Sequence, residues 1–166
     1  FTIFDANCVN TSTQTISISA APVVDFTSTA PKCTGATVDF TNTGTATGVT
    51  WAWTFGTDAA PGTSTDENPA GVIYSTAGTK TVTLTTTNTS SSCAVTVSHT
   101  ININLTPTTT FTTTAPQCVN VGINFTNTGT TGGLWQYNWD FGSGATPATS
   151  NAENQTAVVY STDGTK

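Results

Sequence analysis

The chain repeats itself with a period of 85 to 86 residues. Cys33 recurs as Cys118, and the segment Phe40-Thr41-Asn42-Thr43-Gly44 returns 85 positions later as Phe125-Thr126-Asn127-Thr128-Gly129. Beyond one inserted residue the offset becomes 86. A period of this size is typical of small folding units arranged in tandem.

The repeat predicts how the chain is divided. We expect one complete unit over 21–105, preceded by the last two strands of another unit over 1–20. Residues 106–166 would be a following unit that lacks its last two strands. The first twenty residues fit this scheme because Cys8 lies 85 positions before Cys93. The two ends of the chain are then parts of one kind of unit, each completed by a neighbour.

The finer alignment of the first segment is read from its apolar residues. Ile16 and Ile18 stand 85 positions before Ile101 and Ile103. The opening Phe1-Thr2-Ile3 reads like Val82-Thr83-Leu84, which predicts that the chain starts inside a strand.

Apolar side chains alternate with polar ones along short segments, a pattern of period two that indicates β-strands. Turn signals such as Asn68-Pro69 and Ala77-Gly78 separate these segments, and none has helical periodicity. We predict an all-β fold of tandem Ig-like antiparallel β-sandwiches in a head-to-tail array. The alternating pairs include Val38 with Phe40, Val72 with Tyr74, Val82 with Leu84, and Ile101 with Ile103.

Composition excludes several classes of function. The 166 residues include 43 threonines, three lysines and no arginine, with a net charge of −6. Nucleic-acid binding is not expected, because phosphates need clustered Lys and Arg. Membrane insertion is not expected either, since no apolar run approaches the roughly 18 residues that a spanning helix needs. Regularly spaced aromatics and β-branched Thr argue against disorder.

Two motifs carry a family resemblance. The first is Trp53-Thr54-Phe55-Gly56, repeated as Trp139-Asp140-Phe141-Gly142-Ser143-Gly144, and the second runs from Tyr74 to Leu84 as YSTAGTKTVTL. Both resemble the PKD (polycystic kidney disease) repeat, with Thr54 and Ser143 where the family has Asp. The repeat resembles those of long surface and gliding adhesins of Bacteroidetes, which type IX secretion exports. The resemblance implies an Ig-like fold and an extracellular, cell-surface address, but no reaction.

The four cysteines, Cys8, Cys33, Cys93 and Cys118, are expected to form disulfides in an exported β-protein. Zinc is not expected, because there is no Cys-x-x-Cys pair. In an Ig-like sandwich, Cys33 and Cys93 fall at opposite ends. We therefore expect Cys33 to bridge to the hairpin cysteine of the following repeat. A bridge within one repeat and free thiols are the alternatives.

The aromatic residues divide into core and surface candidates. Trp135 lies beside Gly132-Gly133, outside the alternating pattern, and is the candidate for an exposed contact with a ligand. The core candidates alternate onto one face in each copy; they are Trp51, Trp53 and Phe55, and Tyr137, Trp139 and Phe141.

Candidate chemistry in the charged residues is sparse. Asp58, Asp66 and Glu67 share one loop and are weak candidates for a calcium site, with solvated acidic loops as the alternative. His99 is the only histidine and has no triad partners, so we predict neither enzymatic activity nor a cofactor. Lys80 alternates toward the core, where it either reaches back to water or forms an isopeptide bond with an Asn or Asp.

The sequence predicts a structural segment of an extracellular filament or stalk in a long repeat adhesin, linked to surface adhesion or gliding. One alternative is a carbohydrate- or protein-binding accessory module of a secreted hydrolase. Another is a pilus-like subunit that assembles by donating strands. The expected partners are neighbouring copies of the same repeat, head to tail, with lateral self-association and glycans as further candidates.

Overall fold

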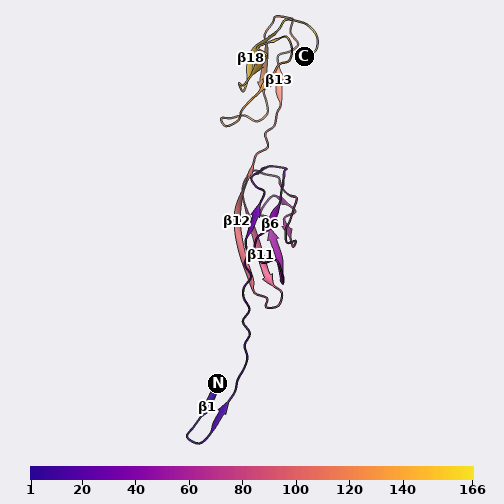
Figure 1. Ribbon diagram of the computed structural model, residues 1–166. Coiled ribbons are helices and arrows are strands. Elements are labelled where there is room, and N and C mark those ends of the chain that lie inside the picture. Colours follow the sequence, from indigo (N-terminus) through magenta and orange to yellow (C-terminus); the bar gives the residue numbers. More distant parts are fainter. The chain divides into compact units, whose positions relative to one another are not determined.

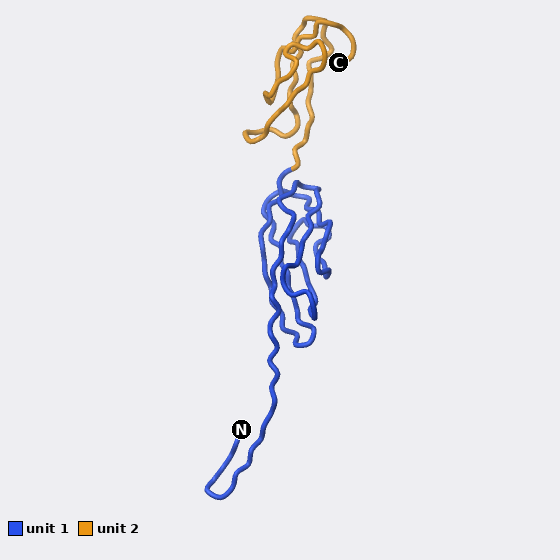
Figure 2. The backbone as a smooth tube through the Cα atoms, in the orientation of Figure 1, with its two compact units in different colours: residues 1–105 blue, residues 106–166 orange.

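The computed structural model describes residues 1–166, and its regular elements are all β-strands. The predicted all-β class is therefore confirmed (Figure 1). The chain divides into two compact units, Phe1–Leu105 and Thr106–Lys166 (Figure 2). No segment forms a helix that is long and apolar enough to cross a membrane.

Residues 21–105 of the first unit form a sandwich of two layers. One layer is a five-stranded sheet in the order β4-β12-β11-β7-β9, and the other contains the pair β3-β6 and the sheet β5-β10-β8. The strands are β3 (Phe26–Ser28), β4 (Lys32–Cys33), β5 (Thr37–Val38), β6 (Phe40–Asn42), β7 (Val49–Thr54), β8 (Ala59–Ala60), β9 (Thr63–Ser64), β10 (Val72–Tyr74), β11 (Gly78–Asn88) and β12 (Ala94–Asn104).

The long hairpin of β11 and β12 supplies much of the sandwich core. Along β11 the inward positions are Lys80, Val82, Leu84 and Thr86, while threonines occupy the outward positions between them. The stiff, β-branched Thr side chain suits an outer face of a sheet. The buried apolar residues of both layers form one cluster: Phe26, Val38, Phe40, Trp53, Phe55, Val72, Tyr74, Val82, Leu84, Ile101 and Ile103.

The chain enters and leaves this sandwich at opposite ends. At the leading end, the Val23 carbonyl accepts a hydrogen bond from Thr45 N, and Thr89, next to the β11–β12 turn, donates to Gly48. At the trailing end, β12 finishes beside β4, where Asn104 pairs with Cys33 in a parallel register. The length of β12 separates the two ends.

The first twenty residues contain a separate hairpin. Its strands β1 (Thr2–Phe4) and β2 (Val9–Thr11) pair antiparallel, with Thr2 opposite Thr11. Every side chain from position 1 to position 20 is exposed. The assignment of this segment to a preceding repeat stays a prediction.

The second unit repeats only part of the sandwich. Its four-stranded sheet β13-β14-β18-β16 and the pair β15-β17 correspond to most of one layer and to β7-β9 of the other. Residues 117–118, the counterpart of β4, form no strand, and residues 106–166 stop before the positions equivalent to most of β11 and all of β12. The strands are β13 (Phe111–Thr113), β14 (Ile123–Asn127), β15 (Trp139–Asp140), β16 (Ala145–Thr146), β17 (Thr149–Ser150) and β18 (Gln155–Tyr160).

The same buried hydrogen bonds recur in both units. Tyr74 donates its hydroxyl proton to the Phe55 carbonyl at 2.9 Å, and Tyr160 does so to Phe141 at 2.8 Å. Burial raises the pKa of Tyr74 to about 12. The repeat in the sequence is thus a repeat in local structure.

Candidate functional site

The three acidic candidates for calcium do not converge. The Asp58 carboxylate binds Thr76 and Lys80, whereas the Asp66 carboxylate accepts a hydrogen bond from Ser64 at 3.0 Å. Glu67 is half-buried next to Asp66. The structure holds no group of three or more His, Cys, Asp or Glu side chains that could bind a metal ion.

Lys80 is buried rather than reaching water, with 6% of its side chain exposed. Its Nζ donates to Thr76 Oγ1 at 2.7 Å and lies 3.4 Å from Asp58 Oδ2. These two oxygens compensate a charge that would otherwise be costly to bury. An isopeptide bond between Lys80 and the neighbouring carboxylate stays a prediction.

The Asp58 interactions make stability depend on acid. Hydrogen bonds from Thr76 and then from Lys80 lower the pKa of Asp58 below its usual value. A carboxyl whose pKa is lower in the folded state stabilises the fold above its unfolded pKa, and this contribution disappears as the pH falls through the folded pKa. We expect the urea concentration at the unfolding midpoint of the sandwich to decrease when the pH is lowered below about 4.

The variant Asp58→Asn keeps the shape of the side chain but removes the titrating group. It should lower the midpoint at pH 7 and flatten its decrease between pH 5 and pH 3. Thr76→Val, which removes the strongest hydrogen bond to Asp58, should flatten the same decrease in part. An unchanged pH profile in Asp58→Asn would contradict this assignment.

The cysteines are free thiols in this structure. Cys33 pairs with Asn104 at the last residue of β12, whereas Cys93 precedes Ala94 at its first residue. The 11 residues of β12 span about 35 Å, while a disulfide needs Cα atoms within about 7 Å. The geometry excludes a bridge between Cys33 and Cys93 of one sandwich. Bridges from Cys8, Cys33, Cys93 and Cys118 to neighbouring repeats stay a prediction.

The aromatic residues of the first unit lie mainly in the core. Trp53 and Phe55 are almost fully buried, and the Trp53 indole N–H donates to the Asp66 carbonyl at 2.8 Å. Trp51 is only half-buried and packs at the edge of the core. Its Nε1 atom is buried without a hydrogen-bond partner.

In the second unit the equivalent side chains are more exposed. Phe141 is buried, but Tyr137 and Trp139 are only half-buried. Phe111 is 57% exposed, whereas its counterpart Phe26 is 6% exposed. In the first unit Phe26 packs against His99 of β12, with ring centroids 4.7 Å apart, and residues 106–166 stop before the equivalent of that strand.

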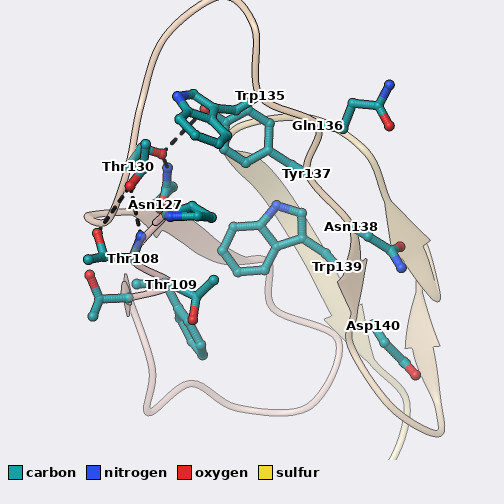
Figure 3. A pocket seen from close by; sticks show the side chains of 13 residues that line it. Thr108, Thr109, Asn127, Thr130, Trp135, Gln136, Tyr137, Asn138, Trp139 and Asp140 are labelled. Atoms are coloured by element: carbon teal, nitrogen blue, oxygen red, sulfur yellow. Dashed lines mark hydrogen bonds between the residues drawn. The ribbon is translucent and has the colours of Figure 1, made fainter. Parts of the chain in front are cut away.

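Two cavities mark the uncovered side of the second unit. One has a volume of about 390 Å³, with Trp135, Tyr137 and Trp139 along one wall and Thr108 and Thr109 opposite (Figure 3). The exposed contact predicted for Trp135 falls here, with 36% of its side chain exposed.

The second cavity, of about 690 Å³, lies between Cys118, Val121, Ile123 and Tyr160. Phe111 lines both cavities, so they adjoin one another. We call their lining the open face. The sequence predicted an incomplete repeat over 106–166 and an exposed contact at Trp135, but it did not predict that the core candidates Tyr137 and Trp139 line a cavity.

His99 makes a hydrogen bond to Asp25 at the surface. Its Nε2 lies 2.7 Å from Asp25 Oδ1, and its ring packs against Phe26 with centroids 4.7 Å apart. The hydrogen bond from His99 lowers the pKa of Asp25. The pair ties β12 to the segment that leads into the sandwich.

Comparison with known proteins assigns the fold to a family. No curated protein matches the chain. A family model for the PKD domain matches residues 19–103, half of the chain and almost all of the complete sandwich. The matched span contains the Trp53 and Tyr74 motifs together with both layers. This chain belongs to the PKD domain family.

Proposed function

We propose that the chain is a structural segment of an extracellular filament or stalk, formed by PKD-like sandwiches joined head to tail. The family supports an extracellular structural or adhesion-type module. The carrying observation is that the complete sandwich receives the chain at one end and releases it at the other, on either side of β12. When domains with this connectivity are linked, each one increases the length of the array by its own length.

The surface fits the same role. Outward positions on β11 and β12 pair hydroxyl with hydroxyl, as in Thr83 with Ser98 and Thr85 with Thr96, both at 2.8 Å. Only 7% of all residues are charged. Such a surface is polar without strong repulsion, which would let neighbouring strings associate laterally. Display on a surface adhesin, with a role in gliding, is the specific setting that we propose.

Covalently linked arrays test this function. Arrays of two, four and eight copies of 21–105 should lengthen by about 35 Å for each added sandwich, because the repeats are joined end to end. Electron microscopy of the arrays measures the increment. A contour length that does not grow with copy number would contradict a stalk.

The second candidate, an accessory module that binds polysaccharide or protein, is favoured by the cavity lined by Trp135, Tyr137 and Trp139. Retention of the chain on chitin, cellulose or collagen that Trp135→Ala abolishes would support this candidate instead. Neither function involves a reaction.

A further inference from the structure

The two cysteines of the complete sandwich lie at the two ends where the chain enters and leaves it. Cys33 is exposed on β4, opposite Asn104 at the trailing end. Cys93 is half-buried in the β11–β12 turn at the leading end, where its carbonyl accepts a hydrogen bond from Asn88 N. Because one sandwich cannot bridge this pair, each cysteine is available to a different neighbour.

The β11–β12 turn extends past the residue at which the sandwich begins. Val23 is anchored there by two hydrogen bonds to Thr45. Two residues later, Asp25 lies level with His99 of β12, since their Oδ1 and Nε2 atoms are 2.7 Å apart. From Asp25 the chain runs in the direction of β12, because it continues into β4, which pairs parallel with β12. Cys93 precedes His99 by six residues, so the turn extends about 13 Å beyond Val23, at about 3.3 Å per residue.

The joint to the next unit has the same length. Thr108 of the second unit is anchored to Thr130 by the same two hydrogen bonds that anchor Val23 in the first. The backbone from Asn104 to Thr108 spans about 13 Å when it is extended. The joint contains a proline, which favours extended backbone at the residue before it. In a head-to-tail array, the turn of each sandwich would therefore come level with Cys33 of the sandwich before it.

We propose that Cys33 forms a disulfide with Cys93 of the following sandwich in a head-to-tail array. A disulfide needs Cα atoms within about 7 Å. Because the two cysteines lie at one level along the array, rotation about the short joint is the movement that brings them together. The inference rests on the proposed stalk and deepens it, because it names a covalent link across each joint.

Formation of the bond removes two protons and two electrons from the two thiols. A low-molecular-weight disulfide such as oxidised glutathione accepts them. One cysteine thiolate attacks this disulfide and releases the first glutathione thiol. The other thiolate then attacks the mixed disulfide and releases the second. Two protein thiols and one glutathione disulfide thus give one protein disulfide and two glutathione thiols.

The bridges would make the array almost inextensible. The shortest covalent path then runs through residues 93–104 of one sandwich, across the joint, and through residues 23–33 of the next, where another bridge begins. When fully extended, this path measures about 85 Å for two sandwiches, whereas two folded sandwiches measure about 70 Å. Residues 34–92 lie outside the path, so their unfolding would add little length.

A matched pair of two-copy arrays tests the pairing. Each copy of 21–105 contains its whole core cluster, so it should fold without flanking residues. The first array carries Cys93→Ser in its first copy and Cys33→Ser in its second, which leaves the proposed pair at the joint. The second array carries Cys33→Ser in its first copy and Cys93→Ser in its second, which leaves the same two cysteines at the outer ends.

The two arrays should respond differently to oxidised glutathione. The first array should form a bridge within the chain at least about tenfold faster than the second, because only its cysteines are held close together. Its intact mass should fall by about 2 Da, the mass of two hydrogens. Peptide mapping without reductant identifies Cys33 and Cys93 as the bridged residues.

Stretching of single eight-copy arrays gives a second measurement. In reduced arrays, each unfolding event should release about 250 Å, because a whole sandwich becomes extended chain. In oxidised arrays, each event should release less than about 20 Å, because the bridges exclude residues 34–92 from the stretched path. The variant Cys33→Ser in every copy should restore the long release under oxidising conditions.

Two outcomes would overturn the inference. One is equal bridging in the two-copy arrays, or faster bridging in the second of them. The other is an oxidised eight-copy array that still releases about 250 Å at each event. The length increment of reduced arrays does not depend on the bridges, so it tests the stalk independently of this proposal.

Discussion

Replacing Trp53 with alanine should cost the complete sandwich about 3–5 kcal/mol of unfolding free energy. Trp53 is 1% exposed and packs against Phe26 and Phe55, with ring centroids 5.1 Å and 6.1 Å away. The variant leaves a cavity between the layers and orphans the Asp66 carbonyl that the indole N–H binds. For a domain of this size the melting temperature should fall by about 15–30 °C, measured by circular dichroism.

Trp139→Ala is the matched control, because the repeat places Trp139 at the equivalent position. Its indole makes the same hydrogen bond, to the Ala152 carbonyl at 2.8 Å, but the side chain is only half-buried. We expect a cost of about 1–2 kcal/mol in the free chain. Equal losses from the two substitutions would contradict the expectation that the deeper burial of Trp53 causes its larger loss of unfolding free energy.

Gly56→Ala should destabilise the same sandwich by about 2–4 kcal/mol, through backbone strain and a clash. Gly56 has φ +82°, in the left-handed region, and a Cβ there would lie 2.7 Å from the Thr81 carbonyl oxygen. That oxygen belongs to β11, which cannot move without disturbing the centre of its sheet. Urea unfolding followed by tryptophan fluorescence measures the loss.

Gly142→Ala separates the two contributions. Gly142 has a similar φ of +76°, but nothing lies within 4 Å of a Cβ added there. Only the strain remains, and the expected cost is about 1–2 kcal/mol. A Gly142→Ala variant as damaging as Gly56→Ala would mean that strain, rather than the approach of β11, dominates at this turn.

Period and alternation were sufficient to predict the class of fold and much of its core. Val38, Phe40, Trp53 and Phe55 alternate with polar residues because one side of each strand faces the opposite layer, so their burial is readable from sequence. The inward direction of Lys80 followed from the same rule. The contact between Lys80 and Asp58 could not be predicted in this way, because Asp58 lies in a loop 22 positions earlier in the sequence.

The site was harder to predict than the fold. A pattern of period two is unchanged when a strand slips by two residues, so alternation could not decide whether Phe1 corresponds to Val82 or to Leu84. The Asp5 carboxylate accepts hydrogen bonds from the N–H groups of Asn7 and Cys8, just as Asn88 accepts them from Ser90 and Ser91. Asp5 therefore corresponds to Asn88, and Phe1 corresponds to Leu84. Residues 106–166 do not include equivalents of most of β11 or of β12, and no local signal in Phe111 or Trp139 distinguishes them from their buried counterparts.

The parallel pairing of β4 with β12 has a mechanical consequence. Tension applied through residues 22 and 105 pulls β4 toward the leading end and β12 toward the trailing end, along the axis that the two strands share. The bond from Thr34 N to the Asn104 carbonyl and the register of Ile103 with Lys32 are then loaded in shear. Bonds loaded this way break together rather than one after another, so the pairing of β4 with β12 would resist unfolding when an array of sandwiches is stretched.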